Sequence, residues 1–145
     1  MQTSAHIKRL LGLLCLLLCT HPAGAEMVVI VQAGSRVEHL ERSEVVNIFM
    51  GRYRRLPDGL QAQPLDIDGE SPERREFYNK LLDKTPAEIN AYWARLTFSG
   101  RTRPPRGLRS QAEVLARVAA DPAAIGYIDR QNLNHHVKVV YILPE

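Results

Sequence analysis

The sequence predicts an α/β domain, a three-layer sandwich in which helices cover both faces of one mixed sheet. Short β-branched apolar runs, typical of buried strands, occur near the start, in the middle and at the end of residues 26–145. Helical patterns that open on cap residues lie between these runs. The order of strand, helix, strand, three helices and two strands favours a single sheet with helices on both sides.

The first 25 residues have the pattern of a secretory signal peptide. Lys8 and Arg9 precede an apolar run over residues 10–19, and an A-x-A motif ends at Ala25. A run this short cannot cross roughly 30 Å of hydrocarbon, which disfavours an uncleaved membrane anchor. We therefore expect cleavage after Ala25, a periplasmic location, no transmembrane segment afterwards, and a single domain over residues 26–145.

Composition excludes several functions for that domain. Both cysteines, Cys15 and Cys19, lie in the predicted signal peptide, which rules out a disulfide, a cysteine metal site or a cysteine nucleophile. Removal of Lys8 and Arg9 reduces 19 basic residues to 17, against 16 acidic ones, so nucleic acid is not an expected partner. No nucleophile–base motif is present, and His135–His136 fits an exposed turn better than a metal site. We predict no enzyme activity, no metal and no cofactor.

The first half of the domain divides into strand, helix, loop and strand. Residues 26–33 form a buried strand in this prediction. Ser43 is the expected N-cap of a helix that ends at Gly51. Residues 52–61 form a loop with a Pro-Asp-Gly turn, and residues 62–67 form the second strand.

Three capped helices and two strands complete the chain. Ser71 caps a helix with proline at its first position, ending at about Leu82. Capping boxes start the other two helices, at Thr85 and Ser110. Between these two helices lies a proline- and arginine-rich loop, expected to be irregular. The final strands are expected at residues 123–129 and 137–143.

The first candidate site is the turn from the second strand into the helix capped by Ser71. Unpaired backbone N–H groups at a helix start favour anions, so Gly69 and Ser71, with added charge from Arg74 or Arg75, form a candidate oxyanion cradle. The acidic residues of the same turn, Asp66, Asp68 and Glu70, oppose an anion there. Two alternatives stay open: Ser71 only caps its own helix, or the acidic turn is a fragment of a calcium loop.

The second candidate site is the arginine-rich loop that leads to Ser110. Arginines near a helix start can hold a phosphate, a carboxylate or an acidic partner, and Arg101, Arg109 and Ser110 are the expected contacts. The alternative is a solvated loop whose charges only promote solubility. Arg52, Arg54 and Arg55, around Tyr53, raise the same question on a smaller scale.

These motifs together resemble the periplasmic phosphate-binding proteins of ABC importers. The segment "LERSEVVNIFMGR" is similar to their "LS-x-x-E-(I/V)-x-x-IF-x-G-K" motif, and "DPAAIGYID" to their "PGAIGYV" strand. The resemblance implies one lobe of a type II periplasmic binding protein, because about 120 residues provide one lobe rather than two. The family's Arg-x-Asp-Gly-Ser-Gly-Thr turn is altered here: Asp66 takes the place of the arginine, and Glu70, Ser71 and Pro72 that of Ser-Gly-Thr.

The leading functional expectation is therefore a periplasmic solute-binding-like protein, related to phosphate transport, that binds phosphate or another small oxyanion weakly. The contacts would come from the helix starts at Ser71 and Ser110 and from the arginines of the second loop. The alternative is an interaction or sensory module without a ligand, which docks onto an envelope membrane protein through its arginine-rich loop.

Overall fold

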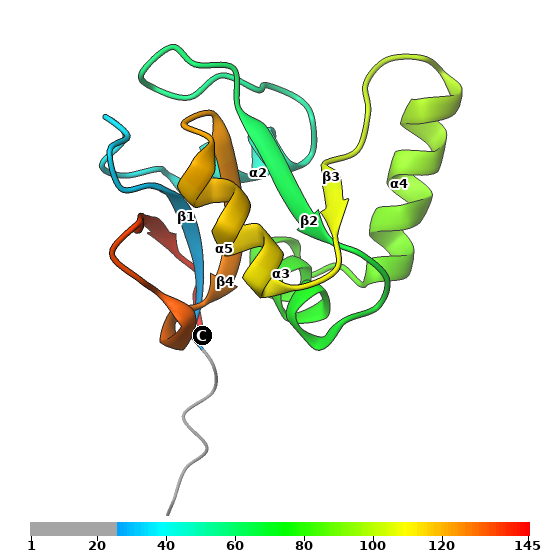
Figure 1. The fold of residues 1–145 in the computed structure, drawn as a ribbon. Coiled ribbons are helices and arrows are strands. Elements are labelled where there is room, and N and C mark those ends of the chain that lie inside the picture. The colour runs from blue at the N-terminus through cyan, green and yellow to red at the C-terminus, as the bar shows by residue number, and fades with distance from the viewer. Residues whose placement is uncertain (1–25) are drawn as a thin grey trace, which may run out of the picture.

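The computed structural model describes residues 26–145, so the predicted signal peptide lies outside the described residues. Five strands form one sheet in the order β3-β2-β4-β1-β5. Four α-helices and a short 3-10 helix connect them (Figure 1). The strands are β1 Met27–Gln32, β2 Gln63–Ile67, β3 Arg106–Leu108, β4 Ala124–Asp129 and β5 Val137–Ile142; the helices are α2 Arg42–Phe49, α3 Pro72–Leu82, α4 Pro86–Phe98, α5 Gln111–Ala120 and η1 Arg130–Asn132.

The sheet is mixed, as the sequence predicts. Strand β2 runs parallel to both β3 and β4, whereas β1 runs antiparallel to β4 and β5. The strands β1 and β4 are almost completely buried, which agrees with their near-continuous apolar sequences. The predicted α/β class and the mixed sheet are therefore confirmed.

Adjacent residues of β4 show that helices cover both faces of the sheet. A Cβ atom on Gly126 would lie 2.4 Å from Val114 of α5, so this face carries α5. The next side chain, Tyr127, points to the opposite face, where its ring stacks on Phe77 of α3 at 3.8 Å between centroids. Phe49 of α2 packs against the same two rings. In Figure 1, α5 and α3 lie on opposite sides of the sheet.

Helix α4 lies beyond the edge strand β3 (Figure 1).

The prediction that the whole segment from Gly100 to Arg109 is irregular was wrong, because Arg106–Leu108 pairs in parallel with β2. The strand is too short to show an apolar pattern. Its pairing depends on backbone contacts, such as the bond from Asp68 N–H to Leu108 O at 2.8 Å. A Cβ atom on Gly107 would lie within 2 Å of the Asp68 carboxylate, so glycine permits this close approach.

The predicted caps are confirmed at Ser71, Thr85 and Ser110, whose hydroxyls accept hydrogen bonds from backbone N–H groups of the first turn. The prediction of Ser43 as an N-cap was wrong. Helix α2 starts two residues earlier than a cap at Ser43 predicts, and its N-cap is Glu41, whose N–H donates to the Glu44 carboxylate at 2.8 Å. A carboxylate three residues into a helix can satisfy this N–H whatever the N-cap side chain is.

Among residues 26–145, no helix has the length and apolar character that crossing a membrane requires.

Candidate functional site

The two candidate helix starts lie at the same edge of the sheet, the edge formed by the carboxyl ends of β2 and β3. Helix α3 follows β2 and helix α5 follows β3, and these parallel strands end side by side. The side chain of Gln111 in α5 donates to the Glu73 carboxylate in α3 at 3.1 Å, so the two helix starts are in direct contact. This edge is where open α/β sheets bind their ligands.

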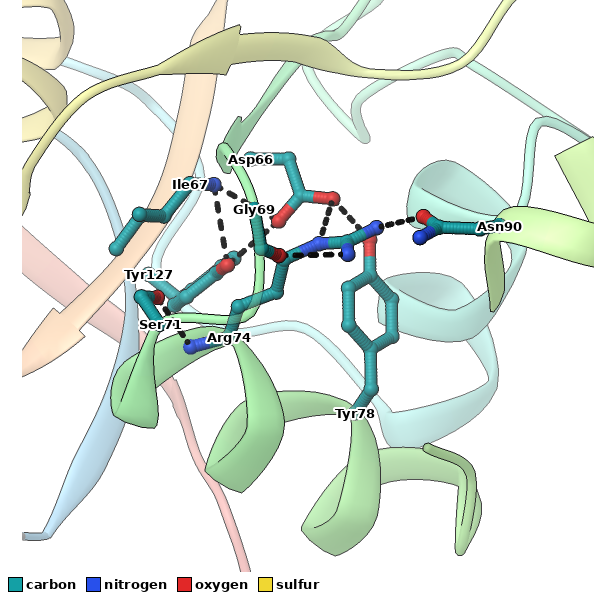
Figure 2. A network of polar contacts seen from close by, with 8 residues as sticks. All are labelled: Asp66, Ile67, Gly69, Ser71, Arg74, Tyr78, Asn90 and Tyr127. Carbon is teal, nitrogen blue, oxygen red and sulfur yellow. Dashed lines mark hydrogen bonds and ion pairs between the residues drawn. The ribbon is translucent and has the colours of Figure 1, made fainter. Parts of the chain in front are cut away.

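Asp66 lies at the centre of a buried polar network between β2 and α3 (Figure 2). Its Oδ2 atom accepts hydrogen bonds from Arg74 Nε at 3.2 Å and from the Tyr78 hydroxyl at 2.8 Å. Its Oδ1 atom accepts from the Tyr127 hydroxyl at 2.5 Å and from the Ile67 N–H at 2.8 Å. Four donors therefore satisfy a carboxylate that is only 6% exposed.

All three guanidinium nitrogens of Arg74 are engaged within the protein. Besides the bond to Asp66, Nη1 donates to Gly69 O at 3.0 Å and Nη2 to Asn90 Oδ1 at 2.9 Å (Figure 2). The residue is only 6% exposed, and its guanidinium lies 5.4 Å from the centre of the Tyr78 ring. The charge expected to attract an oxyanion is thus neutralised by a buried carboxylate.

The two tyrosines of this network act as neutral donors. Burial, and then the charge of Asp66, raises the pKa of Tyr78 well above its usual value. The same two causes raise the pKa of Tyr127. Both hydroxyls therefore keep their protons at neutral pH and donate them to Asp66, so an external anion is not needed to complete the network.

A cavity of about 430 Å³ lies between this network and α4. Asp66 and Asp68 line it together with Arg74, Asn90 and Trp93. Because Arg74 is already paired with Asp66, the exposed charge at this cavity is the carboxylate of Asp68. The lining is consequently unfavourable for a phosphate or sulfate ion.

The remaining predicted contacts at this edge also have partners within the chain. Ser71 accepts from the Arg74 N–H at 3.1 Å, and Ser110 accepts from the Glu113 N–H at 3.3 Å. The guanidinium of Arg109 pairs with Glu113 at 2.6 Å, and the Arg109 N–H donates to the same carboxylate. That backbone bond is the main cause of the lowered pKa of Glu113. A capping box at Ser110 predicts that the Glu113 carboxylate accepts from the Ser110 N–H. That prediction was wrong, because the carboxylate accepts from the Arg109 N–H instead.

Arg101 lies away from these residues. It precedes β3, so it belongs to the opposite edge of the sheet, which is formed by the amino ends of β2 and β3 (Figure 1). There the Arg54 guanidinium donates to the carbonyl of Arg103 and lies over the Trp93 ring at 5.8 Å. The structure therefore brings Gly69, Ser71, Arg74, Arg109 and Ser110 to one edge and Arg101 to the other.

Sequence reasoning missed the residues that hold Arg74. Asp66 stands between Leu65 and Ile67 in a strand, and this alternation places it on the opposite face, where a polar side chain is normally exposed, so its burial had no local signal. Arg74 and Tyr78 are four residues apart, so they lie on one face of α3 and can reach the same carboxylate. Nothing in the sequence indicated Asn90 or Tyr127, which come from α4 and β4.

Arginines and exposed aromatic rings gather at the edge where Arg101 lies. Residues 45–57 and 89–105 contain six arginines and no acidic residue. Phe98, at the end of α4, is 98% exposed, and Tyr53 is 59% exposed. We call Tyr53, Phe98, Arg101 and Arg103 the arginine–aromatic surface; all four side chains are exposed. Exposed aromatic and arginine side chains are enriched where proteins bind other molecules.

Among residues 26–145, no group of three or more histidine, cysteine or acidic side chains could hold a metal ion.

Comparison with solved structures identifies proteins of the same fold. An ABC-type phosphate transport receptor from Vibrio cholerae matches with a TM-score of 0.63 and 14% identity, over 79% of this chain and 45% of the receptor. A putative phosphate ABC transporter substrate-binding protein from Clostridium perfringens, solved with bound phosphate, matches with a TM-score of 0.64 and 17% identity, over 79% and 44%. PstS from Borrelia burgdorferi matches with a TM-score of 0.59 and 14% identity, over 79% and 46%.

Searches with the sequence itself matched no family model and no curated protein. The chain spans less than half the length of the solved structures above, which is the share expected for one of two lobes. The resemblance to phosphate-binding proteins is thus confirmed at the level of the fold. Residues 26–145 have the fold of one lobe of phosphate ABC transporter substrate-binding proteins.

Proposed function

We propose that this chain is an exported, periplasmic, non-enzymatic interaction module that has kept one lobe of the solute-binding fold. In this proposal it docks an acidic segment of an envelope protein on the arginine–aromatic surface. The observation that carries the proposal is the internal pairing of Arg74, whose guanidinium bonds to Asp66, Gly69 and Asn90 and is therefore not available to an oxyanion. Export rests on the signal-peptide pattern of residues 1–25.

The distribution of charge supports an acidic partner. Arg101 and Arg103 lie in the arginine-rich segments that contain no acidic side chain, so nothing nearby in the sequence neutralises them. Phe98, three residues before Arg101 in the chain, adds an almost fully exposed apolar ring. An arginine can bind a carboxylate through two parallel hydrogen bonds, while a buried aromatic ring supplies much of the contact energy at protein interfaces.

Weak oxyanion binding is the second candidate function, and two observations favour it. The helix starts at Ser71 and Ser110 lie together at the edge where such sheets bind ligands. One solved structure of the same fold holds phosphate. We place this function second because Glu73 and Asp68 add negative charge at that edge.

The docking proposal is tested by immobilising residues 26–145 and capturing proteins from envelope extract. We expect a captured protein that is lost in the triple variant Phe98→Ala, Arg101→Ala, Arg103→Ala and released by raising the salt concentration, because salt screens exposed charges. The matched control is Arg36→Ala, Arg75→Ala, Arg117→Ala, three exposed arginines elsewhere on the domain. We expect the control to retain the captured protein.

Capture that is equal for the two triple variants would contradict the proposal. Co-sedimentation with vesicles that contain anionic lipid is measured in parallel. Binding to these vesicles without a captured protein would replace the protein partner with a membrane surface.

A further inference from the structure

A second cavity, about 330 Å³ in volume, lies on the outer side of α4. Its walls are the loop after α2, the end of α3 and one side of α4. The apolar part of the lining comes from Met50, Leu82, Ile89, Ala91 and Tyr92. We call it the Tyr92 cavity. Its volume is near the lower end of the range for small-molecule sites, roughly 300–1,000 Å³.

The Tyr92 side chain fixes the shape of the cavity. Its hydroxyl donates to Met50 O at 2.8 Å, which ties α4 to the loop after α2. Its ring packs against Trp93 with a centroid distance of 5.2 Å. Because the hydroxyl is already satisfied, Tyr92 presents an apolar ring to the cavity rather than a polar group.

The charged residues of the cavity give it an excess of positive charge. Lys84 pairs with Glu88 at 3.1 Å, so these two charges offset each other. Arg52 and Arg95 line the same cavity and are exposed, and within residues 26–145 neither guanidinium forms an ion pair or a hydrogen bond with a side chain. Two available guanidinium groups therefore stand at the mouth of an apolar cavity.

The cavity continues along α2. A neighbouring hollow of about 480 Å³ shares Arg52 and Leu82 with it and is otherwise lined by residues of α2 and its N-terminal end, among them Val46 and Asn47. Arg52 thus lies where the two hollows meet. An elongated ligand could place its charged end at Arg52 and its apolar body against Tyr92.

We propose that the Tyr92 cavity binds a small amphipathic carboxylate, a monocarboxylic acid with an unbranched or aromatic apolar body. Arg52 and Arg95 bind the carboxylate, because guanidinium groups match its geometry and charge. The apolar lining takes up the body of the ligand and removes it from water. The site is separate from the edge that holds Ser71 and Ser110, and it goes beyond the proposed docking function.

The test is calorimetric titration of residues 26–145 with hexanoate, octanoate and octan-1-ol. We expect saturable binding of octanoate at millimolar concentration or below. Hexanoate binds more weakly, by up to about fifteenfold if both extra methylene groups are buried. Octan-1-ol, which has the same chain without the charge, binds at least about tenfold more weakly than octanoate.

A pair of double variants separates this site from general anion attraction. Arg52→Gln, Arg95→Gln is expected to weaken octanoate binding at least about tenfold and to leave octan-1-ol binding unchanged, which would also show that the cavity is intact. Arg101→Gln, Arg103→Gln, which carries the same change in charge outside the cavity, is expected to bind octanoate like the wild type. Absent octanoate binding, equal binding of octanoate and octan-1-ol, or equal losses in the two double variants would overturn the proposal.

Discussion

At the scale of single residues, the pair of Asp66 and Arg74 determines the charge that the turn from β2 into α3 presents. The side chains are only 9% and 8% exposed, and both carboxylate oxygens of Asp66 and all three guanidinium nitrogens of Arg74 are engaged by neighbouring groups. The resemblance to phosphate-binding proteins places an arginine where Asp66 stands. A carboxylate at that position attracts the cation of α3 instead of an external anion.

Removing the charge of Asp66 is expected to destabilise the domain strongly. In Asp66→Asn the buried guanidinium of Arg74 loses its counter-ion, which costs about 3–5 kcal/mol when one partner of a buried pair is removed. Urea unfolding followed by Trp93 fluorescence measures the change. The control is Asp68→Asn, an exposed acid two residues further along, with an expected change within about 0.5 kcal/mol. Equal changes in the two variants would show that the pair contributes no special stability.

The sequence predicted part of this site. The helix start at Ser71 was predictable, because a cap residue followed by proline is a local signal. The pairing of Asp66 with Arg74, Tyr78 and Tyr127 was not, since Tyr127 lies 61 residues further along the chain. The local pattern shows which residues are charged, and only the packing of α3 against the sheet shows which charges meet.

At the scale of elements, capped helices and buried strands were predictable, whereas β3 was not. Helices α3, α4 and α5 start where cap residues place them, and β1, β2, β4 and β5 coincide with apolar runs to within a residue or two. Strand β3 is exposed and contains a glycine, so it has no apolar pattern of its own. It exists because β2 offers a free edge at that point.

Gly126 sets the distance between β4 and α5, so a substitution at this position tests whether α5 packs on that face of the sheet. A methyl group there would lie 2.4 Å from Val114 Cγ1, so Gly126→Ala is expected to cost about 1–3 kcal/mol of unfolding free energy. The control is Gly34→Ala, where the nearest atom is 3.9 Å away. Thermal and urea unfolding measure both variants.

A double-mutant cycle assigns the cost to this contact. When Val114→Ala is present, the added methyl group has room, so the cost of Gly126→Ala is expected to fall by at least about 0.5 kcal/mol. Independent effects of the two substitutions would mean that α5 does not pack on this face of the sheet.

At the scale of the whole molecule, the chain is one lobe with two different edges. The edge with the starts of α3 and α5 is where the fold places a ligand, and the charged side chains of Arg74, Glu73 and Arg109 there have partners within the domain. The opposite edge carries exposed arginines and aromatic rings.

The most direct test of the central claim, that internal pairing has closed the oxyanion site, is calorimetric titration of residues 26–145 with phosphate and with sulfate up to millimolar concentration. We expect no saturable heat for either ion, because Arg74 is paired with Asp66 and the neighbouring lining is acidic. Saturable phosphate binding with a Kd below about 1 mM, corresponding to about −4 kcal/mol, would contradict it and restore the oxyanion receptor as the leading function.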